Sequence, residues 1–359
     1  MNDTATVSDA QLEELFGVPN LFLWQFDDSS ALFVRMDRDA YHNSIFCDQR
    51  ILATNRDIIR IDCSRLHSYL SGRPRCESGL NYIFHIAHCG STLLARALDI
   101  REDNIVYREP VVLRQLGAEA ASGFYGTTPP TQWQQRLDLS VALLSRSYAK
   151  DAPVIVKANV PVNFMTQALL ENGPDNRALL LYSNLENYLL AVLKSANHRS
   201  WVAAICTELG PAIEAVTGIT AEERQDLSIP EAAASLWMAQ MAIFGQIVKA
   251  HSDVRTLDAE VFYGNSENTL QKCFEFVGQS MDGSTISDIV KGELFSRYSK
   301  DPRQSYDNET RLAQREAIRG QLAGDIDKGR DWINQHIGQC DMPSVLGKAL
   351  TEGASPLLD

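Results

Sequence analysis

Short apolar runs alternate with amphipathic stretches from about residue 80 onward. We expect buried strands at 82–87, 104–107, 154–158, 178–182 and 254–257, because each is a brief apolar run that closes on polar residues. Between them, apolar positions recur at helical spacing over 91–99, 131–149, a stretch beginning near 186, 230–251 and 267–277. The alternation predicts an α/β fold with three layers, in which helices flank a central, mostly parallel sheet.

The two ends of the chain differ from this alternation. Residues 1–78 combine a helix candidate at 9–16 with strand-like runs at 21–26 and 31–35, which predicts an N-terminal α+β extension acting as a subdomain or cap. Residues 79–300 form the predicted main domain. Residues 301–359 are expected to be a C-terminal helical extension, with a helix over 309–336 and a loosely held tail in the last twenty residues.

Composition and charge narrow the possible partners. The chain of 359 residues is 45% apolar and 22% charged, as in ordinary globular proteins, and its net charge is −13. An acidic chain is a poor general binder of nucleic acid or anionic membranes, so we expect neither as a partner. The seven scattered cysteines include no Cys-x-x-Cys pair, and the polar, acidic start does not look like a signal peptide, so a cytoplasmic location is expected.

The first expected strand leads into the loop His88-Cys-Gly-Ser-Thr92. Gly90 stands where the backbone must pass close to a ligand, and Ser91 and Thr92 open the next helix. Backbone amides and two hydroxyls then converge on one point, which is a favourable arrangement for an anion. The loop residues His88, Cys89, Gly90, Ser91 and Thr92 are therefore our candidates for phosphate binding. The same pattern also occurs as a plain helix cap.

Two charged residues follow neighbouring strands at the edge where ligands gather. Glu109, within Arg108-Glu109-Pro110, follows the second strand, and Lys157 ends the third. Both are candidate catalytic residues. The alternative is that Glu109 pairs with Arg108 in a purely structural role.

Taken together, these segments resemble the sulfotransferase superfamily over roughly residues 80–280. The loop 87–92 is similar to that family's P-loop, which holds the 5′-phosphosulfate of the donor 3′-phosphoadenosine 5′-phosphosulfate, with His88 in place of its basic residue. The stretch Ile155-Val-Lys-Ala-Asn-Val-Pro161 resembles a family strand end: Lys157 is kept, and Asn159 replaces the histidine base. The resemblance implies a P-loop fold and this donor as cosubstrate, without a metal.

A further segment, 180–191, is similar to the family's strand and helix that carry an arginine and a serine for the donor's 3′-phosphate. Here those positions are Ser183 and Ala191. Ser183 remains a candidate, and Lys194 and Arg199 are further candidates for the same phosphate. Three more basic residues follow later in the chain, of which the first two rank low: Arg297, Lys300 and Arg303.

The resemblance implies transfer of a sulfuryl group to a hydroxyl or amine of a small molecule or conjugate. Asn159 cannot act as a base, so Glu109 is the expected general base. Lys157, with help from His88, is expected to stabilise the phosphosulfate. Cys89 invites a role as nucleophile, but no base is identifiable beside it, so packing is the favoured interpretation.

Two other functions stay open. A P-loop kinase or NTPase would normally carry Gly-x-x-x-x-Gly-Lys-Ser/Thr and a magnesium carboxylate, for which Asp258 is the only obvious candidate here. A non-catalytic protein of the same fold is the other alternative, since the base and the 3′-phosphate positions are replaced.

Overall fold

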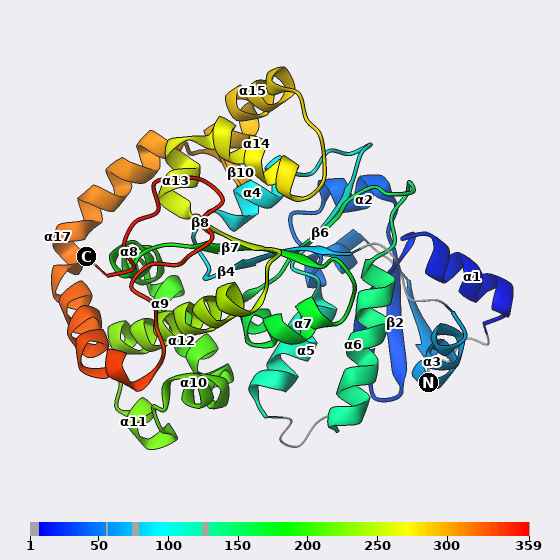
Figure 1. The fold of residues 1–359 in the computed structure, drawn as a ribbon, viewed down its shortest axis with the longest axis horizontal. Coiled ribbons are helices and arrows are strands. Elements are labelled where there is room, and N and C mark those ends of the chain that lie inside the picture. Colours follow the sequence, from blue (N-terminus) through cyan, green and yellow to red (C-terminus); the bar gives the residue numbers. More distant parts are fainter. Residues whose placement is uncertain (1–6, 55–56, 74–78, 124–128, 359) are drawn as a thin grey trace.

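Five parallel strands form the centre of the computed structural model, which describes residues 7–54, 57–73, 79–123 and 129–358. Their order across the sheet is β5, β6, β4, β7, β8, and every neighbouring pair is parallel (Figure 1). The strand bounds are β4 Asn81–His85, β5 Ile105–Arg108, β6 Val154–Lys157, β7 Arg177–Tyr182 and β8 Val254–Asp258. The chain leaves central β4 toward one side for β5 and β6 and toward the other for β7 and β8, so a ligand site is expected at the carboxyl end of β4.

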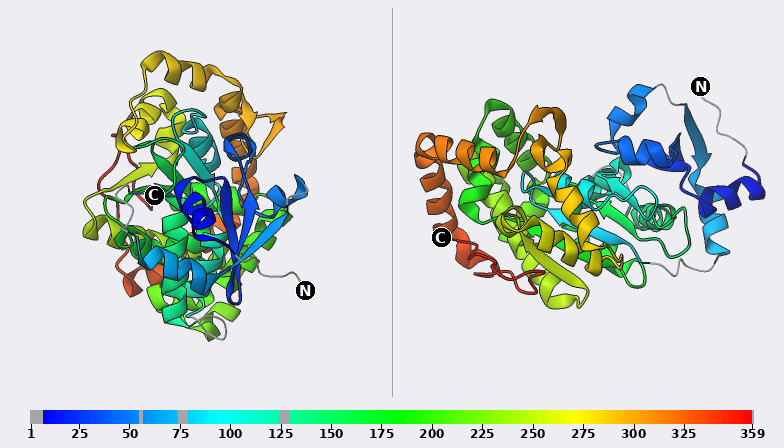
Figure 2. Two further views of the ribbon diagram at one scale, coloured as in Figure 1. Left: turned by 90° about the vertical axis from the view of Figure 1, so that its right-hand side faces the viewer. Right: turned by 90° about the horizontal axis from the view of Figure 1, so that it is seen from above.

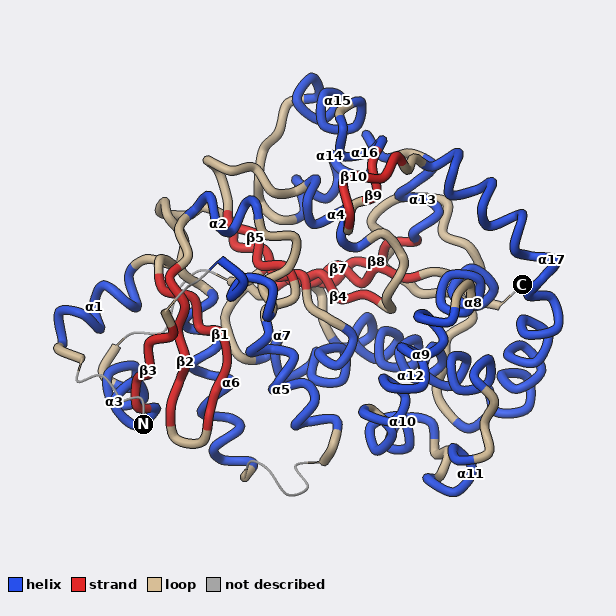
Figure 3. Tube along the Cα trace, turned by 180° about the vertical axis from the view of Figure 1, so that it is seen from behind, coloured by secondary structure: helices blue, strands red, loops and turns tan. Residues whose placement is uncertain are grey.

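Helices cover both faces of this sheet. On one face lie α4 (Ser91–Ala97), α13 (Ala259–Gly264) and α14 (Ser266–Phe276), and on the other lie α5 (Val111–Ala121), α6 (Pro130–Leu144), α7 (Thr166–Glu171) and α12 (Ile229–Ala250) (Figures 1 and 3). The strands are almost wholly buried, as a parallel sheet covered on both faces requires. The predicted three-layer α/β fold is thereby confirmed.

The remaining elements of the main domain connect these layers. They are η2 Val160–Met165, α8 Leu185–Leu193, α9 Ala196–Glu208, α10 Gly210–Thr217, α11 Ala221–Gln225, α15 Gly283–Lys291, α16 Glu293–Ser296, β9 Arg297–Tyr298 and β10 Asp301–Ser305. All five predicted strands begin and end within two residues of the observed bounds, because each is a compact apolar run with polar ends. The polar stretch 295–303 contains a short antiparallel pair, β9 with β10.

A separate antiparallel sheet is formed by the N-terminal residues. Strands β1 (Leu21–Asp27), β2 (Ser30–Arg35) and β3 (Ile58–Asp62) pair in that order. Helices α1 (Asp9–Gly17), α2 (Arg38–Asn43) and α3 (Cys63–Ser71) and the short η1 (Gln49–Thr54) accompany them. This part lies at one end of the molecule (Figure 2). The boundary predicted after residue 78 falls beside residues 74–78, which are outside the described ranges.

The long helix α17 (Asn308–His336) lies at the opposite end, against α8 and α12, and ends in η3 (Ile337–Gln339). The expectation of a loosely held tail after it is wrong. The Leu350 amide donates to the Thr256 carbonyl at 2.8 Å, the Leu185 amide donates to the Leu357 carbonyl at 3.0 Å, and Leu346 and Leu357 are buried. The tail therefore adds a short parallel pairing to the free edge of β8.

Across the described ranges, no helix is both long enough and apolar enough to cross a membrane.

Candidate functional site

The turn from β4 into α4 has an unusual backbone. Ala87, His88 and Gly90 all have positive φ, at 72°, 52° and 87°. Such angles are uncommon for residues other than glycine and are held only where the surrounding structure requires them. A Cβ on Gly90 would lie 2.7 Å from the Tyr263 hydroxyl, so glycine is needed for space as well as for conformation. No side chain caps α4 at Gly90, which leaves its first amides to other partners.

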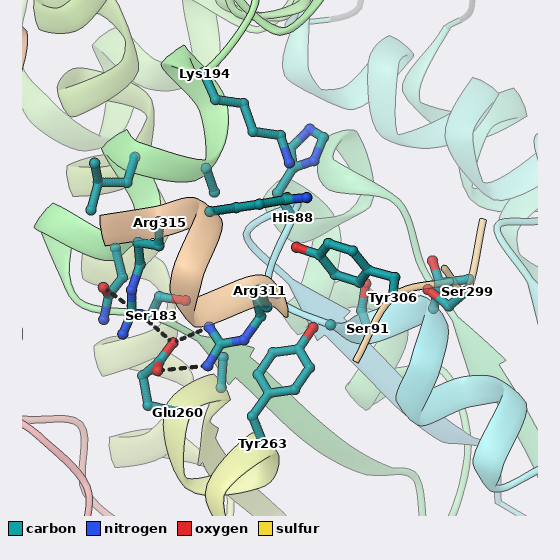
Figure 4. A pocket seen from close by; sticks show the side chains of 18 of the residues that line it. His88, Ser91, Ser183, Lys194, Glu260, Tyr263, Ser299, Tyr306, Arg311 and Arg315 are labelled. Atoms are coloured by element: carbon teal, nitrogen blue, oxygen red, sulfur yellow. Dashed lines mark hydrogen bonds and ion pairs between the residues drawn. The ribbon is translucent and has the colours of Figure 1, made fainter. Parts of the chain in front are cut away.

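A pocket opens over this loop. It is lined by the loop itself, by β7 and α8, by α13, by the β9–β10 turn and by α17 (Figure 4). All five predicted loop residues line it, as do Ser183 and Lys194, so the structure brings these segments together around one pocket. The residues used below are His88, Cys89, Gly90, Ser91, Thr92, Ser183, Lys194, Glu260, Tyr263, Lys300, Arg311 and Arg315. We call this the loop pocket.

Positive charge gathers in the loop pocket. Within the described ranges, neither Lys194 nor Lys300 forms an ion pair with a carboxylate. Burial, and then the charge of Lys157, lower the pKa of Lys300. A pocket that holds lysines without counter-ions, above a loop with open amides, is suited to an anion.

Two arginines of α17 reach the same pocket. Arg311 Nη1 lies 2.7 Å and Arg315 Nη1 lies 2.9 Å from Glu260 Oε1, and the Arg311 guanidinium stands over the Tyr263 ring at 4.1 Å (Figure 4). Burial raises the pKa of Glu260, but hydrogen bonds and charge from Arg311 outweigh it and bring that pKa below its usual value. One carboxylate thus faces two guanidinium groups, and the three groups together carry an excess positive charge.

His88 sits among cations. Its ring is 4.7 Å from the His198 ring and 5.5 Å from the Trp201 ring, and Lys194 extends toward it (Figure 4). Burial, followed by the charges of Lys300, His198 and Lys194, holds the pKa of His88 well below its ordinary value. The imidazole is therefore neutral at pH 7 while the pocket holds no anion. A bound anion would oppose the repulsion and favour the charged form.

A second cavity, of about 630 Å³, adjoins the loop pocket and shares His88, Ser91 and Lys300 with it. Glu109, His85 and Asn159 line this cavity, which also takes in β1 and η1 of the N-terminal part. We call it the Glu109 cavity. The two pockets meet at the loop, with the cationic groups on one side and a carboxylate on the other.

Lys157 lies beneath the Glu109 cavity rather than in it. Its side chain is completely buried and lines neither pocket. The ammonium pairs with the Glu109 carboxylate and lies 3.0 Å from His85 Nε2. We predicted that Lys157 reaches a bound phosphosulfate. The geometry does not favour this, because Glu109 and His85 lie between the ammonium and the cavity.

His85 is held in one tautomer by its backbone partners. The Ala87 amide donates to Nδ1 at 3.0 Å, so Nε2 carries the proton and donates to the Ala158 carbonyl at 2.8 Å. Burial, then the charge of Lys157, lowers the pKa of His85 well below its ordinary value, which keeps the ring neutral.

Arg108 is not the partner of Glu109. Successive strand residues point to opposite faces, and Arg108 is buried on the far side, where it pairs with Asp99. Glu109 has φ of 55°, and its amide donates to the Lys157 carbonyl at 2.7 Å, which turns its side chain toward the cavity. The purely structural pairing of Arg108 with Glu109 is therefore wrong.

The positions of the other basic candidates do not follow the order in which we ranked them for phosphate binding. Arg199 pairs with Asp325 and donates to the Leu193 carbonyl, and it does not line the loop pocket. Arg297 and Arg303 are exposed and pair with Glu293 and Asp301. Lys300, ranked low, lines both pockets. Arg311 and Arg315 were missed, although their spacing of four residues on a predicted helix was a usable signal.

The remaining polar candidates have settled positions. Burial raises the pKa of Cys89 to about 11, and its thiol donates to the Leu181 carbonyl at 3.7 Å, which fits the packing interpretation. Asp258 caps α13 by accepting from the Glu260 amide. Thr92 Oγ1 is buried and has no protein partner in the described chain. The described residues contain no group of three or more side chains arranged to hold a metal ion.

Comparison with known proteins finds no matching family model and no matching curated protein. Similar solved structures include a sulfotransferase from Alicyclobacillus acidocaldarius, at 14% identity and a TM-score of 0.34, over 72% of this chain and 97% of that one. The sulfotransferase domain of the curacin biosynthetic pathway has 11% identity and a TM-score of 0.39, over 75% and 100%. The sulfotransferase domain of the Synechococcus PCC 7002 olefin synthase has 10% identity and a TM-score of 0.38, over 68% and 96%. The solved structures to which this chain is similar thus include sulfotransferases, the family that its sequence motifs resemble.

Proposed function

We propose that the protein transfers a sulfuryl group from 3′-phosphoadenosine 5′-phosphosulfate to an acceptor hydroxyl. The observation that carries the proposal is the junction of two pockets at His88, Ser91 and Lys300. One pocket gathers cations for a donor with two phosphate groups, and the other holds Glu109 for an acceptor. Group transfer between two bound molecules needs this arrangement, because most of the catalysis comes from positioning and charge stabilisation.

The loop would hold the donor's 5′-phosphosulfate. Its open amides, the Ser91 hydroxyl and the unpartnered Thr92 hydroxyl supply donors, and Lys300 supplies positive charge at the junction. The 3′-phosphate would then lie toward Ser183, Lys194 and the two arginines of α17. These arginines compensate for the family's arginine and serine, which are Ser183 and Ala191 here.

In the transfer step the acceptor oxygen attacks sulfur while the bond from sulfur to the bridging phosphate oxygen breaks. The acceptor's proton passes to the Glu109 carboxylate, and the electron pair of the broken bond stays on the 5′-phosphate of adenosine 3′,5′-bisphosphate. Lys300 and the loop amides stabilise that leaving phosphate. Lys157 acts as a positioning residue, because its buried ammonium fixes the Glu109 side chain from below.

Binding of the product nucleotide tests the donor site. Adenosine 3′,5′-bisphosphate without magnesium is expected to raise the melting temperature, since a ligand at 100 times its Kd stabilises the folded state by about 2.7 kcal/mol. ATP with magnesium serves as the comparison. Stabilisation by ATP with magnesium alone would favour a kinase or NTPase, and a response to neither at millimolar concentration would count against a donor site.

Replacing Glu109 tests the chemistry. Glu109→Gln keeps the shape of the side chain but removes the base, so sulfuryl transfer is expected to fall by about 10²-fold or more while bisphosphate binding stays close to that of the wild type. Glu171→Gln on α7, far from both pockets, is the matched control. Unchanged turnover in Glu109→Gln would remove Glu109 from the mechanism.

A further inference from the structure

We propose that the Glu109 cavity takes an uncharged, polyhydroxylated acceptor of the size of a sugar. The inference rests on the proposed function for the identity of the cavity as the acceptor site. Its content is the chemical class of the molecule, which follows from the charges, the unpartnered polar groups and the apolar wall of the cavity.

The cavity offers no spare charge away from the loop. Asp48 is paired with Arg50, and Arg114 lies 2.6 Å from Glu208. Glu109 is paired with Lys157. Among the described residues that line the cavity, Lys300 is the cation that has no carboxylate partner. It lies at the junction with the loop pocket. An ammonium, carboxylate or phosphate of the acceptor that lies away from the junction would therefore lose its hydration without gaining a counter-ion.

Unpartnered amide groups take the place of charges. The side chains of Gln25, Gln49 and Asn159 line the cavity, and none of them forms a hydrogen bond within the described part of the chain. Asn159 Oδ1 is also shielded from solvent. An amide both donates and accepts, so it pairs with a hydroxyl in either direction. These three groups come from β1, from η1 and from the loop after β6, so three separate segments each contribute one amide to the lining.

A strand irregularity helps to place one of them. The register between β1 and β2 shifts between Leu23 and Gln25, so Trp24 is an extra residue in β1. Such a bulge re-aims the side chains that follow it and is common beside functional sites. Gln115 also donates to the Phe26 carbonyl at 3.0 Å and accepts from the Phe26 amide at 2.8 Å, which fixes the edge of β1 against α5. Gln25 is thereby held at the cavity by the backbone.

Part of the cavity lining is apolar. Val160, Pro161, Trp201 and Ile205 form this part, and the Trp201 ring stands next to His88 at the junction. A sugar ring matches such a site, because it has C–H groups on its faces and hydroxyls around its edge. A flat hydrocarbon or simple phenol fits the apolar wall alone and would leave the three amides buried without partners, which costs affinity.

The test measures binding rather than turnover. Saturation-transfer NMR on the whole chain would compare four probes at equal concentration: methyl β-D-glucoside, glucosamine, glucose 6-phosphate and 2-naphthol. Adenosine 3′,5′-bisphosphate is present at saturation, to fill the donor side. The glucoside is expected to bind best, with glucosamine and glucose 6-phosphate weaker by about tenfold or more. Preference for 2-naphthol or for either charged sugar would overturn the proposal, as would no binding of the glucoside.

Two variants test whether the glucoside binds in the Glu109 cavity. Asn159→Leu and Gln25→Met keep the side-chain size and remove the amides, so each is expected to weaken glucoside binding about tenfold while 2-naphthol binding does not fall. Gln167→Met on α7 is the control. Unchanged glucoside binding in both variants would overturn the proposal, and retained bisphosphate binding reports that they fold.

The same experiment separates the two proposals. Bisphosphate binding without glucoside binding overturns the acceptor class and leaves the donor site in place. Glucoside binding that depends on Asn159 without any bisphosphate binding supports the polyhydroxylated ligand and counts against sulfuryl transfer.

Discussion

At the scale of single residues, His88 is where this chain departs most informatively from the motif it resembles. The family's loop carries a permanent cation, whereas His88 is neutral in the ligand-free pocket because burial and the charges of neighbouring lysines disfavour its charged form. An anion placed in the loop reverses the electrostatic part of that balance. His88 would therefore couple the binding of an anion in the loop pocket to the uptake of a proton.

Proton uptake on binding is the expected consequence. The pKa of His88 is higher in the complex than in the free protein, so affinity for adenosine 3′,5′-bisphosphate falls as pH rises through the His88 pKa of the complex, and it levels off at low pH once the free form is also protonated. Calorimetry in buffers of different ionisation enthalpy measures the protons taken up. His88→Asn should lower that number, and His251→Asn, outside both pockets, should not. Equal uptake in His88→Asn would assign the proton to another group.

At the scale of elements, α17 makes a C-terminal extension part of the loop pocket. Arg311 and Arg315 are one helical turn apart and face Glu260, while Arg319, the next in the series, lies 2.9 Å from Glu186 instead. The helix is held in place by its packing against α8 and α12. Its first turns thus complete a pocket whose floor is built some 220 residues earlier in the chain.

This arrangement predicts that removal of Arg311 or Arg315, but not of Arg319, weakens bisphosphate binding. Arg311→Gln and Arg315→Gln should each weaken bisphosphate binding about tenfold or more, since hydrogen bonds between charged groups contribute about 1.5–3 kcal/mol. Arg319→Gln is a matched control on the same helix and should bind like the wild type. Titration calorimetry measures all three. Losses in Arg319→Gln as large as in the other two would mean that the helix, not the pocket, was disturbed.

At the scale of the whole molecule, buried arginines join the N-terminal part to the main domain. Arg108, on β5, donates to the carbonyls of His42 and Ser44 and pairs with Asp99. Arg146, just after α6, donates to the carbonyls of Val18 and Leu21. Because the Glu109 cavity is lined from both parts, this joint also fixes the shape of the cavity.

Removing Arg108 should lower the stability of the folded protein. Arg108→Met leaves the buried Asp99 carboxylate with only His42 beside it, at 3.3 Å, and several carbonyls without donors, so the free energy of unfolding is expected to fall by about 3–5 kcal/mol. Chemical denaturation measures the change, and Arg101→Met, which removes only the exposed ion pairs with Asp39 and Glu102, should change it little. A loss below 1 kcal/mol in Arg108→Met would show that Arg108 contributes little to holding the two parts together.

The sequence by itself determined the central sheet and the loop of residues 88–92 that follows its first strand. Strand and helix periodicities are local, and the loop is contiguous, so His88, Gly90 and Ser91 were found together with the element that positions them. Glu109 was found for the same reason, since it directly follows a strand. These features need no knowledge of which distant segments meet.

Tertiary structure decided everything that depends on packing between distant segments. Lys157 was expected at the ligand and lies buried under Glu109, because a strand end fixes where a side chain starts but not what covers it. Arg199 is occupied by Asp325, while Lys300, Arg311 and Arg315 reach the pocket through the placement of a turn and a helix at the far end of the chain. Charge pairing and burial are long-range properties, and spacing along the chain does not record them.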